Sequence, residues 1–293
     1  MVAPLSASVT AGADWLVPDW PAPPGVWALC TTRTGGSSQP PYDSLNLGTH
    51  VGDDPAAVQA NRQALQAVVQ TRTPTARAVF LNQVHGDGVV HLDATTPDGT
   101  EADACVATAP GAVCTIMVAD CLPVLFAHRN GQAVAAAHAG WRGLAGEGGL
   151  GVLESTFELF KALARAPIAS AAIKIEANTA APAVAADTLA WLGPCIGPQA
   201  FEVGPEVRAA FCDADPAAQA CFVARADAPG KYLCDLAGLA RLRLRALGIT
   251  QIYGNDSTAP WCTVTNASRF FSHRRDAAVL GASGRFAACI WRG

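Results

Sequence analysis

Three consecutive apolar segments decide the fold of this chain: AVCTIMVAD (112–120), CLPVLFAHR (121–129) and QAVAAAHAGW (132–141). Each is short, and only tight breaks separate them, which predicts three buried strands. Between the second and third segments stand Asn130 and Gly131, a pair that tolerates the positive φ of a two-residue turn. We therefore expect the second and third strands to form a hairpin.

Outward from this centre, apolar periodicity and end signals predict further helices and strands. Asp54 is suited to cap a helix whose first turn holds Pro55, because proline needs no backbone donor there. The expected helices cover 55–69, 147–164, 205–212 and 235–247. The expected strands cover 26–31, the start of 188–198 before a Gly/Pro turn, and 285–291. Since strands and helices mix without regular alternation, the expected fold class is α+β rather than a doubly wound sheet.

Turn-forming residues and biased composition predict a loop, a leader and an insertion in the rest of the chain. The segment TGGSSQPPYDSLNLGTHVGDD (34–54) is so rich in the turn-forming residues Gly, Ser, Pro, Asn and Asp that we interpret it as a functional loop. Residues 1–24, rich in Pro, Ala and Trp, predict an irregular N-terminal leader, and residues 25–293 predict a single catalytic domain. Residues 166–187 are rich in Ala and Pro without a clear period, which indicates an insertion in that domain.

Composition argues against several classes of protein. The 293 residues are 51% hydrophobic and 15% charged, a balance that supports a large core and argues against disorder. A net charge of −4 provides no basic field, so nucleic acid is not the expected partner. No apolar run reaches the ~18 residues of a membrane helix, and the N-terminus lacks the pattern of a signal peptide. We therefore expect no membrane partner.

The ten cysteines are scattered along the chain, and no two have CxxC spacing. A chain of this length needs no disulfide staples. We interpret most of the cysteines as small buried hydrophobic residues in a reducing compartment, and the protein is therefore expected in the cytoplasm.

Three residues of metal-binding type stand at expected strand ends or turns. His85 lies in LNQVHGDG, Cys121 in VADCLPV and His138 in AAHAGWRG. A thiolate with two imidazoles suits Zn²⁺, and a catalytic zinc keeps a fourth position for water or substrate. Taken singly, a histidine in an apolar strand or an intracellular cysteine more often packs in a core. The spacings of 36 and 17 residues match no short zinc motif.

Other polar residues are candidates for binding a ligand. Arginine side chains suit phosphate or another anion because they offer paired donors. The arginine candidates are Arg33, Arg62, Arg142, Arg274 and Arg275. Asp103 in EADAC is suited to accept from a histidine or a substrate hydroxyl. His50 and His273 are expected to border a pocket, whereas His91 and His128 are interpreted as structural or surface residues.

These segments resemble the YfiH-type family of purine nucleoside phosphorylases, formerly labelled polyphenol oxidases or laccase-domain proteins and also called peptidoglycan editing factor. The matching stretches are TTRTGGSSQPPYDSLNLGTHVGDD, NRQAL, LNQVHG, ADACV, VADCLPVLF, AAHAGWRGL, WLGPCIGPQAFEVGPEV, KYLCDLAGLARLRL, FFSHRRD and GRFAACIW. They run from about residue 31 to residue 291. Such an ordered series of Gly-, Cys- and His-containing blocks is highly specific.

The resemblance implies a layered α/β/β/α sandwich of α+β class, with mixed sheets and flanking helices. It also implies a zinc site in which His85, Cys121 and His138 are both metal ligands and catalytic residues. The implied reaction is cleavage of adenosine, inosine, guanosine and methylthioadenosine by phosphate to free base and ribose 1-phosphate, accompanied by adenosine deamination. Purine nucleosides and phosphate are the implied partners of a monomer or homodimer.

Within this expectation, the neighbouring polar residues receive hypothetical roles. Arg142, together with Arg33 or Arg62, is expected to hold phosphate. Asn46 and Asp103 are expected to bind ribose hydroxyls or to orient a ligand.

Three other functions remain open from the sequence. The first is a copper-dependent polyphenol oxidase, although six histidines without an HxH pair make a multicopper site unexpected. A single N,N,S site would still bind copper in vitro, because copper outcompetes zinc at such sites. The second is a metal-free hydrolase acting in peptidoglycan editing, with Cys121 as nucleophile and His138 as base. The third is a non-enzymatic role in cell-wall or division control.

Overall fold

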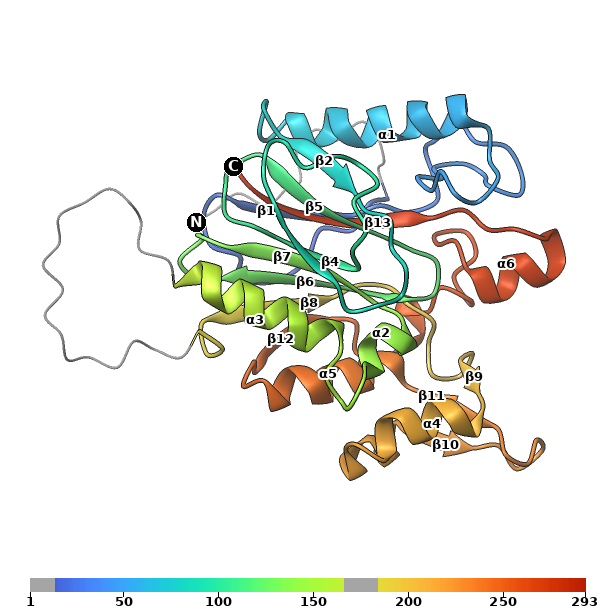
Figure 1. Cartoon of the computed structure of the whole chain (residues 1–293). Coiled ribbons are helices and arrows are strands. Elements are labelled where there is room, and N and C mark those ends of the chain that lie inside the picture. The colour runs from blue at the N-terminus through green and yellow to red at the C-terminus, as the bar shows by residue number, and fades with distance from the viewer. Residues whose placement is uncertain (1–13, 166–183) are drawn as a thin grey trace, which may run out of the picture.

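Two stacked β-sheets form the centre of the fold in the computed structural model, which describes residues 14–165 and 184–293 (Figure 1). The first sheet has four strands in the order β1-β13-β5-β2. Their bounds are Val26–Cys30 for β1, Phe286–Arg292 for β13, Ala112–Val118 for β5 and Arg77–Phe80 for β2. β13 runs antiparallel to both of its neighbours, whereas β2 and β5 are parallel, so this sheet is mixed.

The second sheet has six strands in the order β12-β8-β6-β7-β4-β3. Their bounds are Gln251–Gly254 for β12, Thr188–Leu192 for β8, Leu122–His128 for β6, Val134–Ala139 for β7, Ala104–Ala107 for β4 and Val89–Leu92 for β3. β6 is antiparallel to β7 and to β8, while the outer pairs, β12 with β8 and β3 with β4, are parallel. Both sheets are therefore mixed, as expected from the sequence.

Side chains from both sheets fill the space between them. On β13, Phe286 and Ile290 face the second sheet, while Ala287 and Cys289 face the outer layer. This alternation follows from the two-residue period of a strand. Since both faces are covered, β5, β6 and β7 are buried along their whole length and their sequences are continuous apolar runs.

Helices cover the two outer faces of the sheets. α1 (Pro55–Gln70) packs its apolar side on the first sheet. α3 (Val152–Ala164), α5 (Leu236–Ala246) and the short α2 (Trp141–Ala145) pack on the second sheet. Figure 1 shows the layers from top to bottom as α1, the first sheet, the second sheet, and α3 with α5. The layered α/β/β/α arrangement is confirmed.

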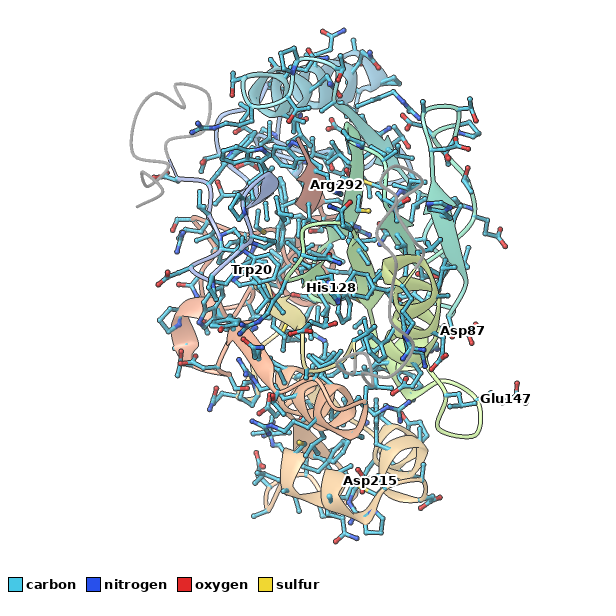
Figure 2. All side chains as sticks on the ribbon, turned by 90° about the vertical axis from the view of Figure 1, so that its left-hand side faces the viewer. Trp20, Asp87, His128, Glu147, Asp215 and Arg292 are labelled. Atoms are coloured by element: carbon cyan, nitrogen blue, oxygen red, sulfur yellow. The ribbon has the colours of Figure 1, made fainter. Side chains whose placement is uncertain are left out.

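A smaller unit lies beyond the second sheet, at the lower end of the molecule in Figure 2, where Asp215 marks it. It contains the three-stranded sheet β10-β11-β9. The bounds in this unit are Glu202–Val203 for β9, Pro205–Cys212 for α4, Pro216–Cys221 for the 3-10 helix η1, Phe222–Ala224 for β10 and Tyr232–Cys234 for β11. Strands of two or three residues leave no periodic signal, so the sequence predicts only α4 here. The remaining elements are the 3-10 helix η2 (Ala259–Trp261) and α6 (His273–Leu280).

Helix starts agree with the sequence where a capping residue is present. α1 begins at Pro55, and Asp54 Oδ1 accepts from the backbone N–H of Ala56 at 3.0 Å, as expected for an N-cap. α3 begins at Val152, later than the expected start at 147. The reason is that three glycines within 146–149 adopt positive φ between 59° and 83°, which a right-handed helix does not contain.

β6 and β7 form the expected hairpin, but its connection is longer than the two-residue turn predicted from Asn130 and Gly131. Gly131 has a positive φ of 71°, whereas Asn130 does not, and the Gly131 N–H donates to the His128 carbonyl oxygen at 2.8 Å. A turn followed by a glycine in the left-handed region is a common longer hairpin connection. It preserves the antiparallel register of β6 and β7.

The expected leader and insertion fall partly outside the described residues. Of residues 1–24, the structure describes 14–24, where Leu16 forms a β-bridge with Cys30 and Trp20 packs against the core between the sheets. Of the insertion expected at 166–187, residues 166–183 lie outside the described part, and 184–187 form a turn before β8. None of the helices described is long and apolar enough to cross a membrane.

Candidate active site

The start of β6 and the end of β7 bring a thiol and an imidazole together. In this antiparallel pair, Pro123 lies opposite His138 and Leu122 opposite Ala139. Cys121 immediately precedes β6, so it lies at the same end of the hairpin as His138. Asp120, with a φ of 88°, turns the chain sharply where it passes from the first sheet into the second. Cys121 therefore lies at the junction of the two sheets.

His85 comes from the turn after β2 and has a left-handed φ of 64°. This conformation costs a residue with a Cβ ~1–2 kcal/mol. The carboxylate of Asp103 holds the turn, because it accepts from the backbone N–H groups of Val84, His85 and Gly86 at 3.1, 2.9 and 2.7 Å. These charge-assisted hydrogen bonds offset the strain and fix the position of the His85 ring.

Asp103 also fixes His138. Its Oδ1 lies 2.8 Å from Nδ1 of His138, and its carbonyl oxygen accepts from the His138 N–H at 2.7 Å. Burial acts to raise the pKa of Asp103, but hydrogen bonds from His138 and from the turn amides outweigh it and lower the pKa below its usual value. Asp103 is therefore a carboxylate that accepts from Nδ1–H, which leaves Nε2 of His138 for a metal or a substrate.

The three expected ligands converge. The ligand atoms of His85, Cys121 and His138 lie within 4.8 Å of one another, and the two imidazole centroids are 4.7 Å apart. In a tetrahedral zinc site such atoms are roughly 3.3–3.6 Å apart, given bonds of about 2.0–2.3 Å. Gly140 leaves room for this approach, because a Cβ there would lie 3.0 Å from Cδ2 of His85 and 3.1 Å from the Cys121 sulfur. The donor set and its convergence therefore suit a zinc ion with one open position, whose binding would draw the ligand atoms closer together.

The same contacts set the ionisation of the metal-free cluster. Burial acts to raise the pKa of Cys121, but the charge of His138 and hydrogen bonds from His138 and His85 lower it to about 6. Burial acts to lower the pKa of His138, but the Cys121 thiolate and Asp103 raise it to about 9. Near neutral pH the pair is therefore a thiolate and an imidazolium. The thiolate is the form of cysteine that binds metal.

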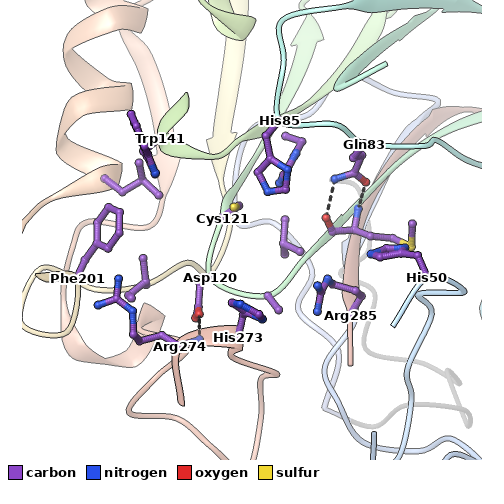
Figure 3. A pocket seen from close by; sticks show the side chains of 16 residues that line it. His50, Gln83, His85, Asp120, Cys121, Trp141, Phe201, His273, Arg274 and Arg285 are labelled. Carbon is purple, nitrogen blue, oxygen red and sulfur yellow. Dashed lines mark hydrogen bonds between the residues drawn. The ribbon is translucent and has the colours of Figure 1, made fainter. Parts of the chain in front are cut away.

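The cluster faces a cavity of about 390 Å³, a size typical of small-molecule sites. One end of the cavity is mainly aromatic and apolar, although the Arg274 guanidinium lies 5.7 Å from the centroid of the Phe201 ring there. The residues at this end are Trp141, Ile196, Phe201 and Leu236. Figure 3 shows Trp141 and Phe201 on the left of the cavity, with His85 and Cys121 near its middle. Flat apolar walls of this kind suit a planar aromatic ligand.

The opposite end of the cavity is polar and basic. Figure 3 shows His50, Gln83 and Arg285 on this side. The amide of Gln83 is already engaged, because it donates to the carbonyl oxygen of Met117 and accepts from its N–H, each at 2.8 Å. Burial lowers the pKa of His50, and the charges of Arg285 and Arg62 lower it further, so this ring is neutral at pH 7.

The start of α6 closes the cavity below the cluster in Figure 3, where His273, Arg274 and Asp120 meet. Asp120 Oδ2 accepts from the backbone N–H of Arg274 at 2.6 Å, and its Oδ1 accepts from the Thr263 hydroxyl at 2.5 Å. The Arg274 guanidinium donates to the carbonyl oxygen of Glu202. Asp120 thus ties α6 to the turn that carries Cys121. His50, His273 and Arg274, which the sequence singled out, do border the cavity.

The five residues expected to bind substrate are not among those that line the cavity; they are Arg33, Asn46, Arg62, Asp103 and Arg142. Arg33 bonds to the carbonyl oxygen of Asp43 at 2.8 Å. Arg62 donates to the carbonyl oxygen of Leu47 at 2.9 Å, although its Nη2 also approaches the sulfur of Met117, a cavity residue. Asn46 is fully buried. The roles of these residues toward phosphate and ribose stay predictions.

Arg142, one of these five residues, and Arg275 differ in their surroundings. Arg142 is exposed and lies over the Trp141 ring, 4.5 Å from its centroid, so it backs a cavity wall without facing the cavity. Arg275 is engaged in the structure, because it pairs with Asp276 at 2.6 Å and donates to the carbonyl oxygen of Thr263 at 2.6 Å. Its guanidinium holds the chain around α6.

Sequence reasoning did not single out Arg285, Trp141 or Phe201 as site residues. Each lies inside a stretch quoted above, namely GRFAACIW, AAHAGWRGL and WLGPCIGPQAFEVGPEV. The signal for Arg285 is a lone charge directly before an apolar strand. The two aromatic residues carry no such signal, since aromatic side chains more often pack in a core.

In metal-free protein, iodoacetamide at pH 7 is expected to modify Cys121 at least about tenfold faster than any other cysteine, because Cys121 alone combines partial exposure with a lowered pKa. Burial raises the pKa of Cys30, Cys114, Cys195, Cys212, Cys221, Cys234 and Cys289. Prior addition of zinc is expected to protect Cys121. Peptide mass mapping measures both effects, and modification of Cys121 that zinc leaves unchanged would contradict a metal at this cluster.

The family described as multi-copper polyphenol oxidoreductase laccase matches residues 27–293. A Pseudomonas aeruginosa protein named purine nucleoside phosphorylase PA4543 is 46% identical over 277 residues, covering 94% of this chain and 98% of that protein. An Escherichia coli (strain K12) protein named purine nucleoside phosphorylase YfiH is 46% identical over 276 residues, with the same coverage of both chains.

A solved structure is similar over the same extent. The crystal structure of Neisseria meningitidis protein NMB0706 superposes with a TM-score of 0.77 at 43% sequence identity, and it covers 95% of this chain and 98% of that one. The similarity therefore includes both sheets and all three segments that carry His85, Cys121 and His138.

Proposed function

Since the chain belongs to the multi-copper polyphenol oxidoreductase laccase family, we propose that it is a purine nucleoside phosphorylase that works with a metal ion held by His85, Cys121 and His138. The family membership expected from the sequence blocks is confirmed. The main support for this activity is that relatives named purine nucleoside phosphorylase are 46% identical over nearly the whole chain. The cavity supports it, because the His-Cys-His cluster stands between an aromatic end and a basic end.

Phosphorolysis makes defined demands on such a site. The bond between C1′ of ribose and N9 of the purine breaks, and a bond between C1′ and a phosphate oxygen forms. The electron pair of the broken bond leaves with the purine, which takes up a proton, while the sugar passes through an oxocarbenium-like state. The enzyme must therefore stabilise a departing base on one side of the sugar and hold phosphate on the other.

The cavity meets these demands in its arrangement of side chains. Trp141 and Phe201 offer flat surfaces on which a purine can stack. The cationic Arg285 lies at the other end, where an anion is stabilised. Between these ends, Asp103 holds His138 in the tautomer with Nε2 directed to the cluster. In this proposal the ribose lies against the cluster, with its two reacting bonds directed to opposite ends of the cavity.

Zinc is the metal we propose, because two imidazoles and a thiolate with one open position form a typical catalytic zinc set. Bound there, zinc would supply a Lewis acid that polarises a ligand group and lowers the pKa of a bound water. The same N,N,S donors would also bind copper in vitro, following the usual order of metal affinities. His85, Cys121 and His138 would hold the ion, and Asp103 would orient the His138 imidazole and hold the turn that carries His85.

The finer features of the proposal rest on the family resemblance. We include adenosine, inosine, guanosine and methylthioadenosine as substrates, with adenosine deamination as an accompanying activity. The protein is proposed to act in the cytoplasm as a monomer or homodimer. The ten free cysteines support this location, because unpaired thiols persist in a reducing compartment.

Chelation of the metal is expected to lower adenosine phosphorolysis at least about 100-fold, and one equivalent of zinc is expected to restore it. The assay follows adenine, ribose 1-phosphate and inosine from adenosine, with and without phosphate, on protein of known metal content. Adenine and ribose 1-phosphate are expected only with phosphate, whereas inosine is expected with or without it. Equal adenine release in both conditions would identify a hydrolase instead of a phosphorylase.

One specific arrangement favours a second candidate, a metal-free cysteine hydrolase. The thiol of Cys121 has a lowered pKa and lies beside the imidazole of His138. The carboxylate of Asp103 orients that imidazole, as in a nucleophile–base–acid triad. The comparisons do not favour this candidate, since the relatives are named phosphorylases. The chelation experiment separates the two, because a cysteine nucleophile keeps its activity without metal and loses it on alkylation of Cys121.

The comparisons do not favour polyphenol oxidase activity either, despite the description of the family. Multicopper chemistry needs several metal-binding clusters. In residues 14–165 and 184–293, one group of at least three metal-binding side chains is found, the His-Cys-His cluster.

A further inference from the structure

The basic end of the cavity contains a positive charge without a carboxylate partner. Arg285 is partly buried and lines the cavity. Its Nη1 donates to the carbonyl oxygens of Ser283 and Gly284 at 2.9 and 3.0 Å, so two sequence neighbours engage this one atom. In the part of the chain that the structure describes, no carboxylate oxygen lies within 4.0 Å of its guanidinium. Among the described residues, Nε and Nη2 have no hydrogen-bond partner, so both can donate to a ligand.

Two other half-buried arginines are neutralised by acids, whereas Arg241 donates only to backbone carbonyl oxygens. Arg243 pairs with Glu154 at 2.8 Å, and Arg33 pairs with Asp43 at 3.2 Å. Burial lowers the pKa of Arg285, although the negative charges of Cys121 and Asp120 oppose this effect. A cation that is partly removed from water and lacks a paired acid is stabilised by a bound anion.

The loop 34–54 is built around the path of the Arg285 side chain. Oδ1 of Asn46 accepts from the backbone N–H groups of Arg285 and Gly48, at 2.8 and 2.9 Å. Nδ2 of Asn46 donates to Asp53 at 2.9 Å, which anchors the amide. A Cβ at Gly48 would lie 2.8 Å from Cγ of Arg285, so glycine is required for the side chain to pass. Asn46, expected to bind ribose, therefore locks the loop to the start of β13.

We propose that Arg285, with His50 beside it, forms the site that binds inorganic phosphate in this cavity. The proposal rests on the proposed phosphorylase function and names the place of its second substrate. A guanidinium presents two parallel N–H donors to two phosphate oxygens. The neutral His50 ring adds one more N–H donor and carries no negative charge that would repel phosphate. Figure 3 shows the resulting order, in which the basic end lies across the cluster from Trp141 and Phe201.

The Arg285→Gln protein is expected to bind inorganic phosphate roughly 10- to 100-fold more weakly than the wild type, because charge-assisted hydrogen bonds are lost. Calorimetric titration with inorganic phosphate measures this on the full chain, both zinc-loaded and metal-free. In steady-state kinetics, the KM for phosphate should rise by a similar factor while the KM for adenosine changes less than about threefold. The Arg285→Lys protein, which keeps the charge but not the paired donors, should lie between the two.

A second variant tests the same site without removing the charge. Gly48→Ala is expected to displace the Arg285 side chain and to weaken phosphate binding, with the guanidinium still present. Arg72→Gln is the matched control, since Arg72 is exposed and stacks on Trp27 at 5.2 Å, outside the cavity lining. The control should leave phosphate affinity unchanged, and thermal melting verifies that each variant is folded.

The outcomes separate this inference from the function on which it rests. Unchanged phosphate affinity in folded Arg285→Gln protein would overturn the inference even if phosphorolysis is confirmed, as would a wild type that binds no inorganic phosphate. If Arg285→Gln weakens adenosine 5′-monophosphate but not inorganic phosphate, the site takes the phosphate group of a nucleotide and the inference is wrong. If phosphate binding depends on Arg285 but no ribose 1-phosphate forms, the proposed function fails and the phosphate site remains.

Discussion

Replacement of Cys121 by alanine is expected to remove the bound metal and to lower kcat/KM for adenosine phosphorolysis at least about a thousandfold. Cys121 supplies the only thiolate of the cluster and lines the cavity together with the two imidazoles. Two histidines alone hold zinc weakly, because catalytic zinc sites use three protein ligands. A thousandfold loss corresponds to about 4 kcal/mol of transition-state stabilisation, a magnitude typical for removal of one central electrostatic element.

Metal content and activity must be measured together for this variant, since a nucleophilic cysteine would also be inactivated by the substitution. Elemental analysis is expected to find about one zinc per wild-type chain and far less in Cys121→Ala. Cys221→Ala is the matched control, because Cys221 is also partly exposed but lies outside the cavity lining. A Cys121→Ala protein that keeps full zinc occupancy but no activity would favour the cysteine hydrolase.

Replacement of Asp103 by asparagine is expected to reduce zinc affinity about 10- to 100-fold and to lower the free energy of unfolding by roughly 3–5 kcal/mol. The carboxylate accepts from three turn amides and from His138, and the side chain is fully buried. An amide of the same shape must direct its NH₂ group toward one of these donors, which leaves unsatisfied N–H groups in the interior. Both the His85 turn and the His138 tautomer would lose their support.

Competition with a chromophoric chelator measures the zinc affinity of this variant, and urea denaturation of metal-free protein measures its stability. Asp87→Asn is the control, because Asp87 lies in the same turn but is exposed. The folded-state pKa of Asp103 is lowered, so its contribution to stability is present above the unfolded-state value, about 3.9, and is lost as pH falls through the folded-state value. Equal zinc affinity in Asp103→Asn and wild type would show that Asp103 has no part in metal binding.

The convergence of His85, Cys121 and His138 was easier to predict from the sequence than the rest of the cavity, and the reason lies in the kind of signal each residue gives. His85, Cys121 and His138 are rare residue types within short glycine-containing blocks, so their positions are conspicuous. Arg33 and Arg62 occur in similar blocks, but each contacts a backbone carbonyl of the loop 34–54. Nothing in local composition distinguishes an arginine that supports a loop from one that faces a cavity.

The position of Arg285 in the cavity could not be predicted from the sequence. Its surroundings come from segments far apart in sequence, since Asn46 bonds to its backbone across 239 positions. The strands show the same limit: the segments at 112–120 and 121–129 are adjacent and equally apolar, yet β5 and β6 belong to different sheets. The sequence predicted both strands because burial makes each an apolar run. It could not assign them to sheets, because that depends on the sharp turn at Asp120.

The position of β13 sets an order for the assembly of this protein during synthesis. β13 is the last strand of the chain, yet it lies inside the first sheet, between β1 and β5. The second sheet uses only earlier strands, so a growing chain can form it first, while β1 and β5 lack their shared neighbour until β13 has been synthesised. Arg285 directly precedes β13 and arrives with it. A growing chain can thus already carry His85, Cys121 and His138 while the cavity still lacks one wall, and the site is complete only after β13 has joined the first sheet.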